Sequence, residues 1–192
     1  KTSYGLETSA LYGFINQILK LIKSENPDLI ACAFDSKEKT FRHKMYEKYK
    51  AQRPKMPDEL QNQLSYLWEL LEVLKLPILK KSGVEADDIM AYISTTLLKE
   101  DEQAVIMSTD KDFLQLVNDT TIVWSPTKKK MYNTKMVKEE YGIESKNLLL
   151  YRVLDGDNSD NIPGVYGCGI KTGVKRVPEI TEDTELSVDD LL

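Results

Sequence analysis

Short acidic clusters at the ends of apolar runs constrain the fold of this chain more than any other feature. Each cluster follows an apolar strand pattern or opens a helical pattern, so side chains from distant segments can converge. Strands that alternate with helices predict a three-layer α/β fold around a mostly parallel sheet, whose carboxyl edge collects functional side chains. The eight carboxylates are Asp35, Glu85, Asp87, Asp88, Asp110, Asp112, Asp157 and Asp160.

Hydrophobic periodicity predicts where the elements of this fold lie. We expect Thr8 or Ser9 to cap the first helix. Leu60, Leu64, Leu67, Leu71 and Leu74 have the spacing of a buried helical stripe. The expected helices cover residues 8–24, 58–75, 134–140 and 146–154, with further helices opening at Glu85 and near Phe113, and the expected strands cover 29–34, 76–79, 103–107 and a hairpin of 121–124 with 130–132.

Composition excludes several classes of protein. The 192 residues are 41% hydrophobic and 30% charged, which is typical of a globular domain. No apolar run approaches the roughly 20 residues of a membrane span, and we predict a cytoplasmic protein. Cys32 and Cys168 lack metal-type spacing and are expected to be reduced structural thiols.

The basic segment 37–55 contrasts with the net charge of -5 of the whole chain. It holds eight Lys or Arg residues against two Glu, a local charge of +6, interleaved with Phe41, Tyr46 and Tyr49. Lysines and arginines can follow phosphates while aromatic rings stack on unpaired bases, so the segment predicts contact with nucleic acid. A solvated charged face is the alternative. His43, the single histidine, is expected to contact DNA or to be structural rather than to act as a general base.

Clustered carboxylates repel one another unless a cation neutralises them, and hard divalent ions such as Mg²⁺ prefer oxygen ligands. The pattern therefore predicts a phosphoryl-transfer site with two metal ions. The alternatives are local: acidic residues favour helix N-termini, which suits residues 85–88, and a capping turn would explain residues 110–112. An Asx-turn would explain residues 157–160. An EF-hand counted from Asp155 is excluded, because its sixth and twelfth positions hold Asp160 and Tyr166.

A glycine-spaced loop at residues 164–169 precedes a basic helical pattern at 170–176. Such a loop can expose backbone N–H groups to a phosphate, and Lys171, Lys175 and Arg176 favour contact with a DNA backbone. By spacing alone, an ordinary loop is equally compatible with these glycines.

Six short motifs together resemble the 5'-nuclease family. That family includes the 5'-3' exonuclease domain of bacterial DNA polymerase I, phage 5'-exonucleases of the ribonuclease H type, and flap endonucleases. The similarity extends in order over residues 8–177, and the stretch 124–128 and the acidic tail are more similar to the phage branch. The motifs are residues 33–36, 40–43, 49–54, 83–88, 108–112 and 156–164.

The resemblance implies a role for each of these positions. Glu85, Asp87, Asp110 and Asp112, with Asp35 nearby, would line one metal position, and Asp88, Asp157 and Asp160 would complete or support the second. Lys50 and Arg53 would lie on a basic helical arch or its base and contact the scissile phosphate, so that the catalytic residues are Lys50, Arg53, Asp110 and Asp157. The implied DNA-binding residues are Arg42, His43, Tyr46, Tyr49, Lys50, Arg53, Gly164, Gly167, Gly169, Lys171, Thr172 and Lys175.

The resemblance also implies a PIN-like core at residues 1–145, with an arch at about 37–57, and a helix-hairpin-helix DNA-binding module at 146–192. The loop of this module often holds a potassium ion in the family. Members begin with a strand that carries an Asp-Gly-Asn-type ligand; we expect this strand to be missing here and the C-terminal module to be truncated. Tyr166, Cys168 and Ile170 depart from the residues that the family often has in the loop.

These expectations predict a monomeric, metal-dependent, structure-selective 5' nuclease that uses two Mg²⁺ or Mn²⁺ ions. Its substrates would be 5' flaps, nicked or gapped duplexes and RNA–DNA hybrids, in replication primer removal or repair, beside replication proteins. The alternative is a catalytically impaired module that binds DNA junctions. A PIN-like single-strand ribonuclease ranks lower, because that class is usually shorter and lacks the loop at 164–169.

Overall fold

The computed structural model describes residues 2–3 and 5–191, and the chain divides into two compact units. The first contains Lys1–Glu38 and Pro54–Ala86, and the second contains Lys39–Arg53 and Asp87–Leu192. The hydrophobic core of the second unit includes Ile143 and Leu148 together. The boundary predicted at residue 145, between a nuclease core and a DNA-binding module, is a different division and stays a prediction.

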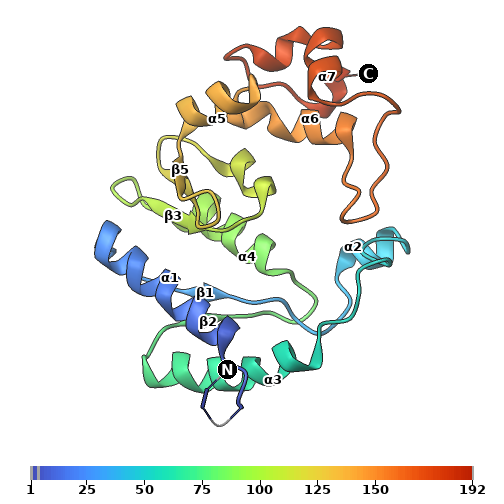
Figure 1. Cartoon of the computed structure of the whole chain (residues 1–192). Helices are drawn as coiled ribbons and strands as arrows, with labels where there is room; N and C mark the ends of the chain where they lie inside the picture. Colours follow the sequence, from blue (N-terminus) through green and yellow to red (C-terminus); the bar gives the residue numbers. More distant parts are fainter. Residues whose placement is uncertain (1, 4, 192) are drawn as a thin grey trace. The chain divides into compact units, whose positions relative to one another are not determined.

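The first unit is built on a short parallel pair of strands, β1 (Cys32–Ala33) and β2 (Ile78–Leu79). Helices α1 (Ser9–Glu25) and α3 (Asp58–Val73) lie beside this pair (Figure 1). The Phe34 ring, just after β1, contacts Trp68 of α3 with ring centroids 4.4 Å apart. This aromatic contact fixes the end of β1, and thereby the position of Asp35.

Two predictions for the first unit are wrong in detail. The strand expected at 29–34 has only two paired residues, and Leu29 is 89% exposed, because β2 is equally short. Neither Thr8 nor Ser9 caps α1 through its side chain; the buried Gln63 of α3 accepts hydrogen bonds from the backbone N–H groups of Ala10 and Leu11 instead. A side chain from a distant helix thus satisfies the N-terminus of α1.

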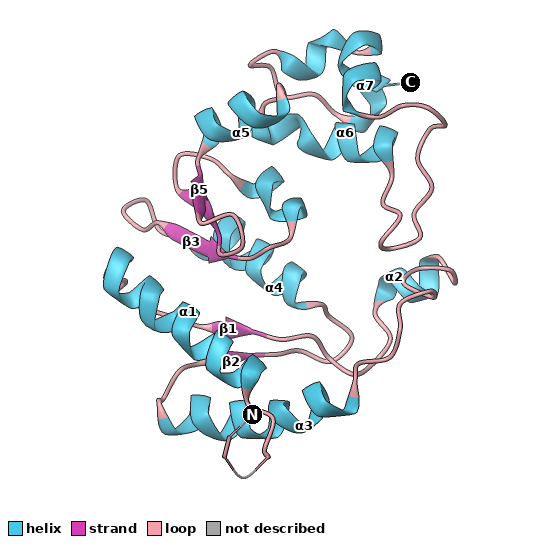
Figure 2. Cartoon of the chain, viewed as in Figure 1, coloured by secondary structure: helices cyan, strands magenta, loops and turns pink. Residues whose placement is uncertain are grey.

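The second unit contains a three-stranded sheet in the order β3-β4-β5. Figure 2 draws its strands in magenta, with β3 and β5 labelled. Strand β3 (Ala104–Met107) pairs in parallel with β4 (Thr121–Ser125), and β4 pairs antiparallel with β5 (Lys130–Tyr132), which confirms the predicted hairpin. Within the described residues the strands therefore form two sheets rather than the single sheet that we predicted.

Helices complete the second unit. Asn147 is fully buried, and its side chain holds the C-terminal segment by bonding Thr184 O at 2.9 Å and Leu186 N at 3.1 Å. The elements are α2 (Phe41–Met45), α4 (Ala86–Tyr92, whose first residue ends the first unit), the π-helix η1 (Ile93–Leu97), the 3₁₀ helix η2 (Lys111–Leu116), α5 (Thr134–Tyr141), η3 (Ser145–Asn147), α6 (Leu148–Asp155), α7 (Ile170–Arg176), η4 (Pro178–Thr181) and η5 (Val188–Leu191).

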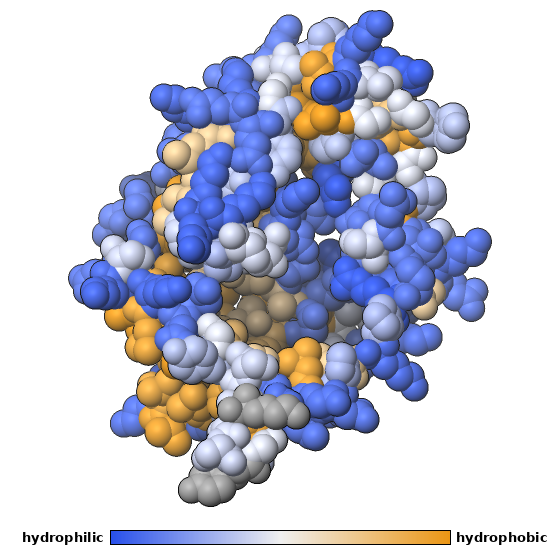
Figure 3. Space-filling model, viewed as in Figure 1, coloured by the Kyte–Doolittle hydropathy of each residue, from blue (hydrophilic) through white to orange (hydrophobic). Residues whose placement is uncertain are grey.

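Large apolar side chains are exposed on the first unit. Leu19, Val73 and Leu74 are 56%, 77% and 49% exposed, so the C-terminal end of the predicted α3 stripe is not buried. Figure 3 shows hydrophobic residues at the visible surface of this unit. No helix in the described parts of the chain is long and apolar enough to cross a membrane.

Candidate functional site

Arg152 of α6 gathers three carboxylates in the second unit. Its Nη2 lies 2.7 Å from Asp157 Oδ2, its Nε lies 2.9 Å from Asp112 Oδ1, and its Nη1 lies 3.8 Å from Asp155 Oδ2. The guanidinium therefore neutralises carboxylates that come from η2, the end of α6 and the loop after it. Two of them, Asp112 and Asp157, are predicted metal ligands.

A local turn places Asp110 and Asp112. Strand β3 ends at Met107, and Asp110 caps η2 by accepting a hydrogen bond from the backbone N–H of Asp112 at 2.9 Å. Ser108 Oγ in turn accepts the N–H of Asp110 at 3.0 Å. The capping turn that the sequence allowed is thus present, and it also fixes both carboxylates at the carboxyl end of a strand.

Asp157 organises the loop after α6. Its Oδ1 accepts from Ser159 N at 2.8 Å and from Ser159 Oγ at 2.7 Å, as in an Asx-turn, and its backbone pairs with Ile162. The loop needs glycine at two places: a Cβ on Gly156 or Gly164 would overlap the backbone of the opposite strand of the loop. Packing of the loop therefore requires glycine at position 164 whether or not this residue contacts DNA.

The two carboxylates beside Arg152 differ in their pKa. Burial raises the pKa of Asp112 and outweighs the opposing effect of Arg152, while Asp110 and Asp157 raise it further. Burial also acts to raise the pKa of Asp157, but the hydrogen bonds from Ser159 and the charge of Arg152 outweigh it and lower this pKa. Asp157 thus stays ionised more readily than Asp112.

The donor set fits a hard divalent cation. Asp112 Oδ1 is buried, and its neighbour is the Arg152 guanidinium, with which it forms an ion pair at 2.9 Å. Carboxylate oxygens of this kind are preferred ligands of Mg²⁺ and Mn²⁺. Among the described residues, no three His, Cys, Asp or Glu already lie together as a metal-binding group.

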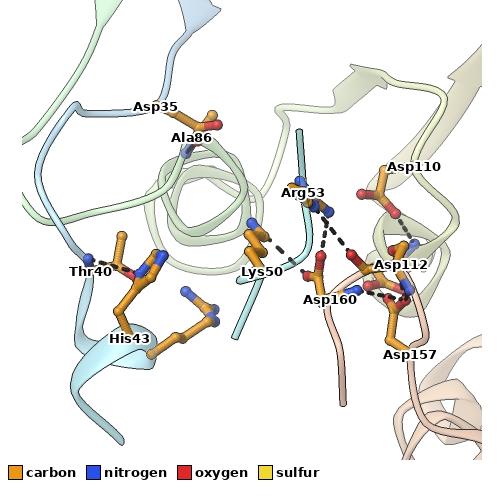
Figure 4. A network of polar contacts seen from close by, with 12 residues as sticks. Asp35, Thr40, His43, Lys50, Arg53, Ala86, Asp110, Asp112, Asp157 and Asp160 are labelled. Atoms are coloured by element: carbon orange, nitrogen blue, oxygen red, sulfur yellow. Dashed lines mark hydrogen bonds and ion pairs between the residues drawn. The ribbon is translucent and has the colours of Figure 1, made fainter. Parts of the chain in front are cut away.

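The base of the predicted arch contacts the Asp157–Asn161 loop. Asp160 forms ion pairs with Arg53 and, at 4.0 Å, with Lys50, and its backbone O accepts from Lys50 N at 3.0 Å (Figure 4). Asn161 Nδ2 donates to Lys48 O at 2.9 Å. The structure thus brings together the predicted phosphate-contacting cations and one predicted metal ligand.

The rest of the basic segment is held by its own neighbours. Arg42 makes a bidentate contact with Asp88, at 2.8 and 2.7 Å. The ring of His43 accepts a hydrogen bond from Thr40 N at 3.2 Å and packs edge-on against the buried Tyr49, with centroids 5.1 Å apart. Tyr46 is more open, at 36% exposed. The Nδ1 atom of His43 is thus used within the chain.

In the first unit, a hydrogen bond joins Asp35 to the backbone of Ala86, the residue that follows Glu85. Asp35 follows β1, and its Oδ1 accepts from the backbone N–H of Ala86, the first residue of α4, at 2.8 Å. Glu85 precedes that residue and is 5% exposed. Asp87 and Asp88 follow in the first turn of α4, where the helix dipole favours them.

The loop at 164–169 connects α6 and α7. Gly167 has a φ of +69°, Gly169 is the N-cap of α7, and Thr172 N donates to Gly169 O at 2.9 Å. Tyr166 is fully exposed. Lys171 and Lys175 follow on α7. The predicted succession of helix, glycine loop and basic helix is confirmed as structure, and its contact with DNA stays a prediction.

Comparison with known proteins decides the family. Residues 1–142 match the family model described as 5'-3' exonuclease, N-terminal resolvase-like domain. The chain belongs to the 5'-3' exonuclease family. It is 39% identical to a 5'-3' exonuclease of Aquifex aeolicus over 90% of this chain and 60% of that protein, and 35% identical to DNA polymerase I of Bacillus subtilis over 97% of this chain and 22% of that protein.

A solved nuclease structure has the same fold. The bacteriophage T5 D15 flap endonuclease, in a complex with DNA and metal ions, superimposes with a TM-score of 0.74 at 26% identity, covering 91% of this chain and 68% of that one. This likeness confirms the predicted α/β nuclease fold. The chain spans 60% of the Aquifex relative and about a fifth of the polymerase.

The most central residue of the cluster, Arg152, was missed from the sequence. A signal was present: Arg152 precedes Asp155 by three residues on a helix, a spacing that places both side chains on one face. Its contact with Asp112 depends on tertiary packing, which no local pattern reports.

Proposed function

We propose that this chain is the nuclease part of a metal-dependent 5' nuclease, which hydrolyses phosphodiesters near junctions of single-stranded and duplex DNA. The observation that carries the proposal is the contact of Lys50 and Arg53 with Asp160, in the same unit that clusters Asp112 and Asp157 around Arg152. Phosphate-binding cations and oxygen ligands thereby meet in one structural unit. The named relatives, an exonuclease and a flap endonuclease bound to DNA and metal ions, support it.

Asp110, Asp112, Asp157 and Asp160 would hold Mg²⁺ or Mn²⁺ ions in the second unit. Divalent ions held there would lower the pKa of a water and offset charge on the phosphate oxygens. The other predicted metal ligands remain predictions: Asp35, Glu85, Asp87 and Asp88. That the site holds two metal ions likewise remains a prediction.

The chain's own residues bind and orient the substrate. Lys50 and Arg53 exchange Asp160 for the phosphate, whose developing charge they stabilise. Arg152 holds Asp112 and Asp157 in place and limits their repulsion. Arg42, His43, Tyr46 and Tyr49 would guide the strand, with Lys171, Thr172 and Lys175 on the duplex backbone.

We propose further that α6, the loop 164–169 and α7 form the helix-hairpin-helix module, with a potassium ion in the loop. Polar backbone contacts of this kind read duplex shape rather than sequence. The substrates would be 5' flaps, nicked or gapped duplexes and RNA–DNA hybrids, handled by a monomer during primer removal or repair in the bacterial cytoplasm.

The test is cleavage of a 5'-labelled flap duplex by the full-length protein with Mg²⁺, with EDTA as control. Asp110→Asn and Asp157→Asn should each reduce cleavage by at least about 100-fold while junction binding persists. Asp119→Asn, which removes an exposed carboxylate of the same unit, is the matched control and should cleave normally. Tight binding without Mg²⁺-dependent products would instead favour the junction-binding module.

A further inference from the structure

A cavity of about 150 Å³, lined by both polar and apolar side chains, opens beside Asp110 in the second unit. Its wall combines side chains from the β3–η2 turn, from the end of β4 and from the β4–β5 connection: Ser108, Thr109, Lys111, Ser125, Thr127 and Lys128. The buried side chains of Leu114, Val123 and Tyr132 form its apolar floor. The space is about ten times the roughly 10–15 Å³ that a single water needs.

Hydroxyl groups in this wall retain hydrogens to donate. Ser108 Oγ is an acceptor for Asp110 N, so its O–H is available to a ligand. Ser125 Oγ and Thr127 Oγ1 lie 3.4 Å apart, and only one of the two can donate to the other. A ligand rich in acceptor oxygens would satisfy these donors.

The charged side chains that line the cavity are Lys111, Lys128 and Asp110. Lys128 Nζ donates to Tyr132 Oη at 2.9 Å and to Glu140 Oε1 at 2.6 Å, which uses two of its three N–H groups. Lys130 binds the same Glu140 at 2.7 Å, so two ammonium groups share one carboxylate. Lys111 has no ion-pair partner among the residues that the structure describes, and it lies between Asp110 and Asp112 in sequence.

We propose that this cavity is a phosphate-binding subsite, which holds a backbone phosphate of the nucleic acid next to Asp110. The phosphate oxygens accept from Ser108, Thr127 and Lys128, and Lys111 compensates their charge. The subsite deepens the proposed function and rests on it, because it positions one nucleotide relative to the carboxylates of η2.

The test is isothermal titration calorimetry of the full-length protein in EDTA, with inorganic phosphate, thymidine 5'-monophosphate and thymidine as separate ligands. Both phosphates should bind and thymidine should not. Lys111→Met and Thr127→Val should weaken phosphate binding roughly five- to tenfold. Lys135→Met, which removes an 81%-exposed lysine outside the cavity, should not.

The outcomes separate the subsite from the rest of the site. If the nucleotide binds more tightly than inorganic phosphate, the subsite recognises the nucleoside as well as the phosphate. If the two bind equally, the subsite recognises the phosphate group alone. Absence of binding, or loss of binding in Lys50→Met but not in Lys111→Met and Thr127→Val, overturns the proposal. Because EDTA prevents cleavage, a failure here is distinguishable from a failure of the flap assay.

Discussion

Replacement of Arg152 by Met should destabilise the metal-free protein and increase its response to Mg²⁺. The guanidinium lies within 2.9 Å of both Asp112 and Asp157, and its side chain is 30% exposed. Its loss leaves two partly buried carboxylates without their cation. Charge-assisted contacts of this kind contribute about 1.5–3 kcal/mol, and partial exposure places the expected loss near 2 kcal/mol.

This loss of unfolding free energy corresponds to a measurable decrease in Tm. For a chain of this size, 1 kcal/mol corresponds to roughly 2–4 °C in Tm, so Arg152→Met should lower Tm by about 4–8 °C in EDTA. Added Mg²⁺ can replace the missing charge, because the freed carboxylates bind it. Saturating Mg²⁺ should therefore raise the Tm of the variant more than that of the wild type.

Scanning calorimetry in EDTA and in Mg²⁺ measures both effects. Arg176→Met is the matched control, since it removes an exposed arginine of α7 in the same unit. If both variants lose equal stability, or if Mg²⁺ raises the Tm of wild type and Arg152→Met by the same amount, the argument that Arg152 compensates the carboxylates is refuted.

Two further predictions concern the scaffold. Gly164→Ala should lower the free energy of unfolding in urea by at least about 2 kcal/mol, because its Cβ would overlap the Asp155 backbone. Gly13→Ala, in open space on α1, should instead raise it by up to about 1 kcal/mol. Similar effects of the two substitutions would contradict the packing argument. Hydrogen bonds from Lys128 and then Lys130 lower the pKa of Glu140 from its ordinary 4.5 to about 2. The stabilisation by Glu140 is therefore complete above pH 4.5 and lost as pH falls toward 2. The deficit of Glu140→Gln, about 1–2 kcal/mol at pH 7, should shrink between about pH 4.5 and 2 in urea unfolding, and a constant deficit would exclude this linkage.

The sequence predicted the elements well where side-chain periodicity decides the structure. Helices α1 and α3 and the hairpin of β4 and β5 lie where their patterns placed them. Hydrophobic periodicity did not predict the buried position of a polar residue. Gln63 of α3 is buried because its side chain caps α1, a contact across 53 positions. Leu74 has the right spacing but lies past the end of α3, where it is 49% exposed.

The candidate site was predicted as a set of residue types, and its partners were not. Acidic residues after strands can be read from sequence because local turns fix them, as the N-cap role of Asp110 shows. The cations that meet them lie far along the chain: Arg53 reaches Asp160 across 107 positions. Only the packed structure specifies such pairs.

These pairings give one physical account of how the carboxylates tolerate one another. Four predicted metal ligands of the second unit contact a cation of the chain itself: Asp112 and Asp157 contact Arg152, Asp160 contacts Lys50 and Arg53, and Asp88 contacts Arg42. A folded protein can then hold the acidic cluster without metal, because each internal cation limits the repulsion. Metal and substrate would act by exchange: Asp112, Asp157 and Asp160 would hold divalent ions in place of their internal cations, and Lys50 and Arg53 would then bind the phosphate. Binding of phosphate by Lys50 and Arg53 should consequently be tighter with Ca²⁺ than in EDTA, and Asp160→Asn should reduce that difference.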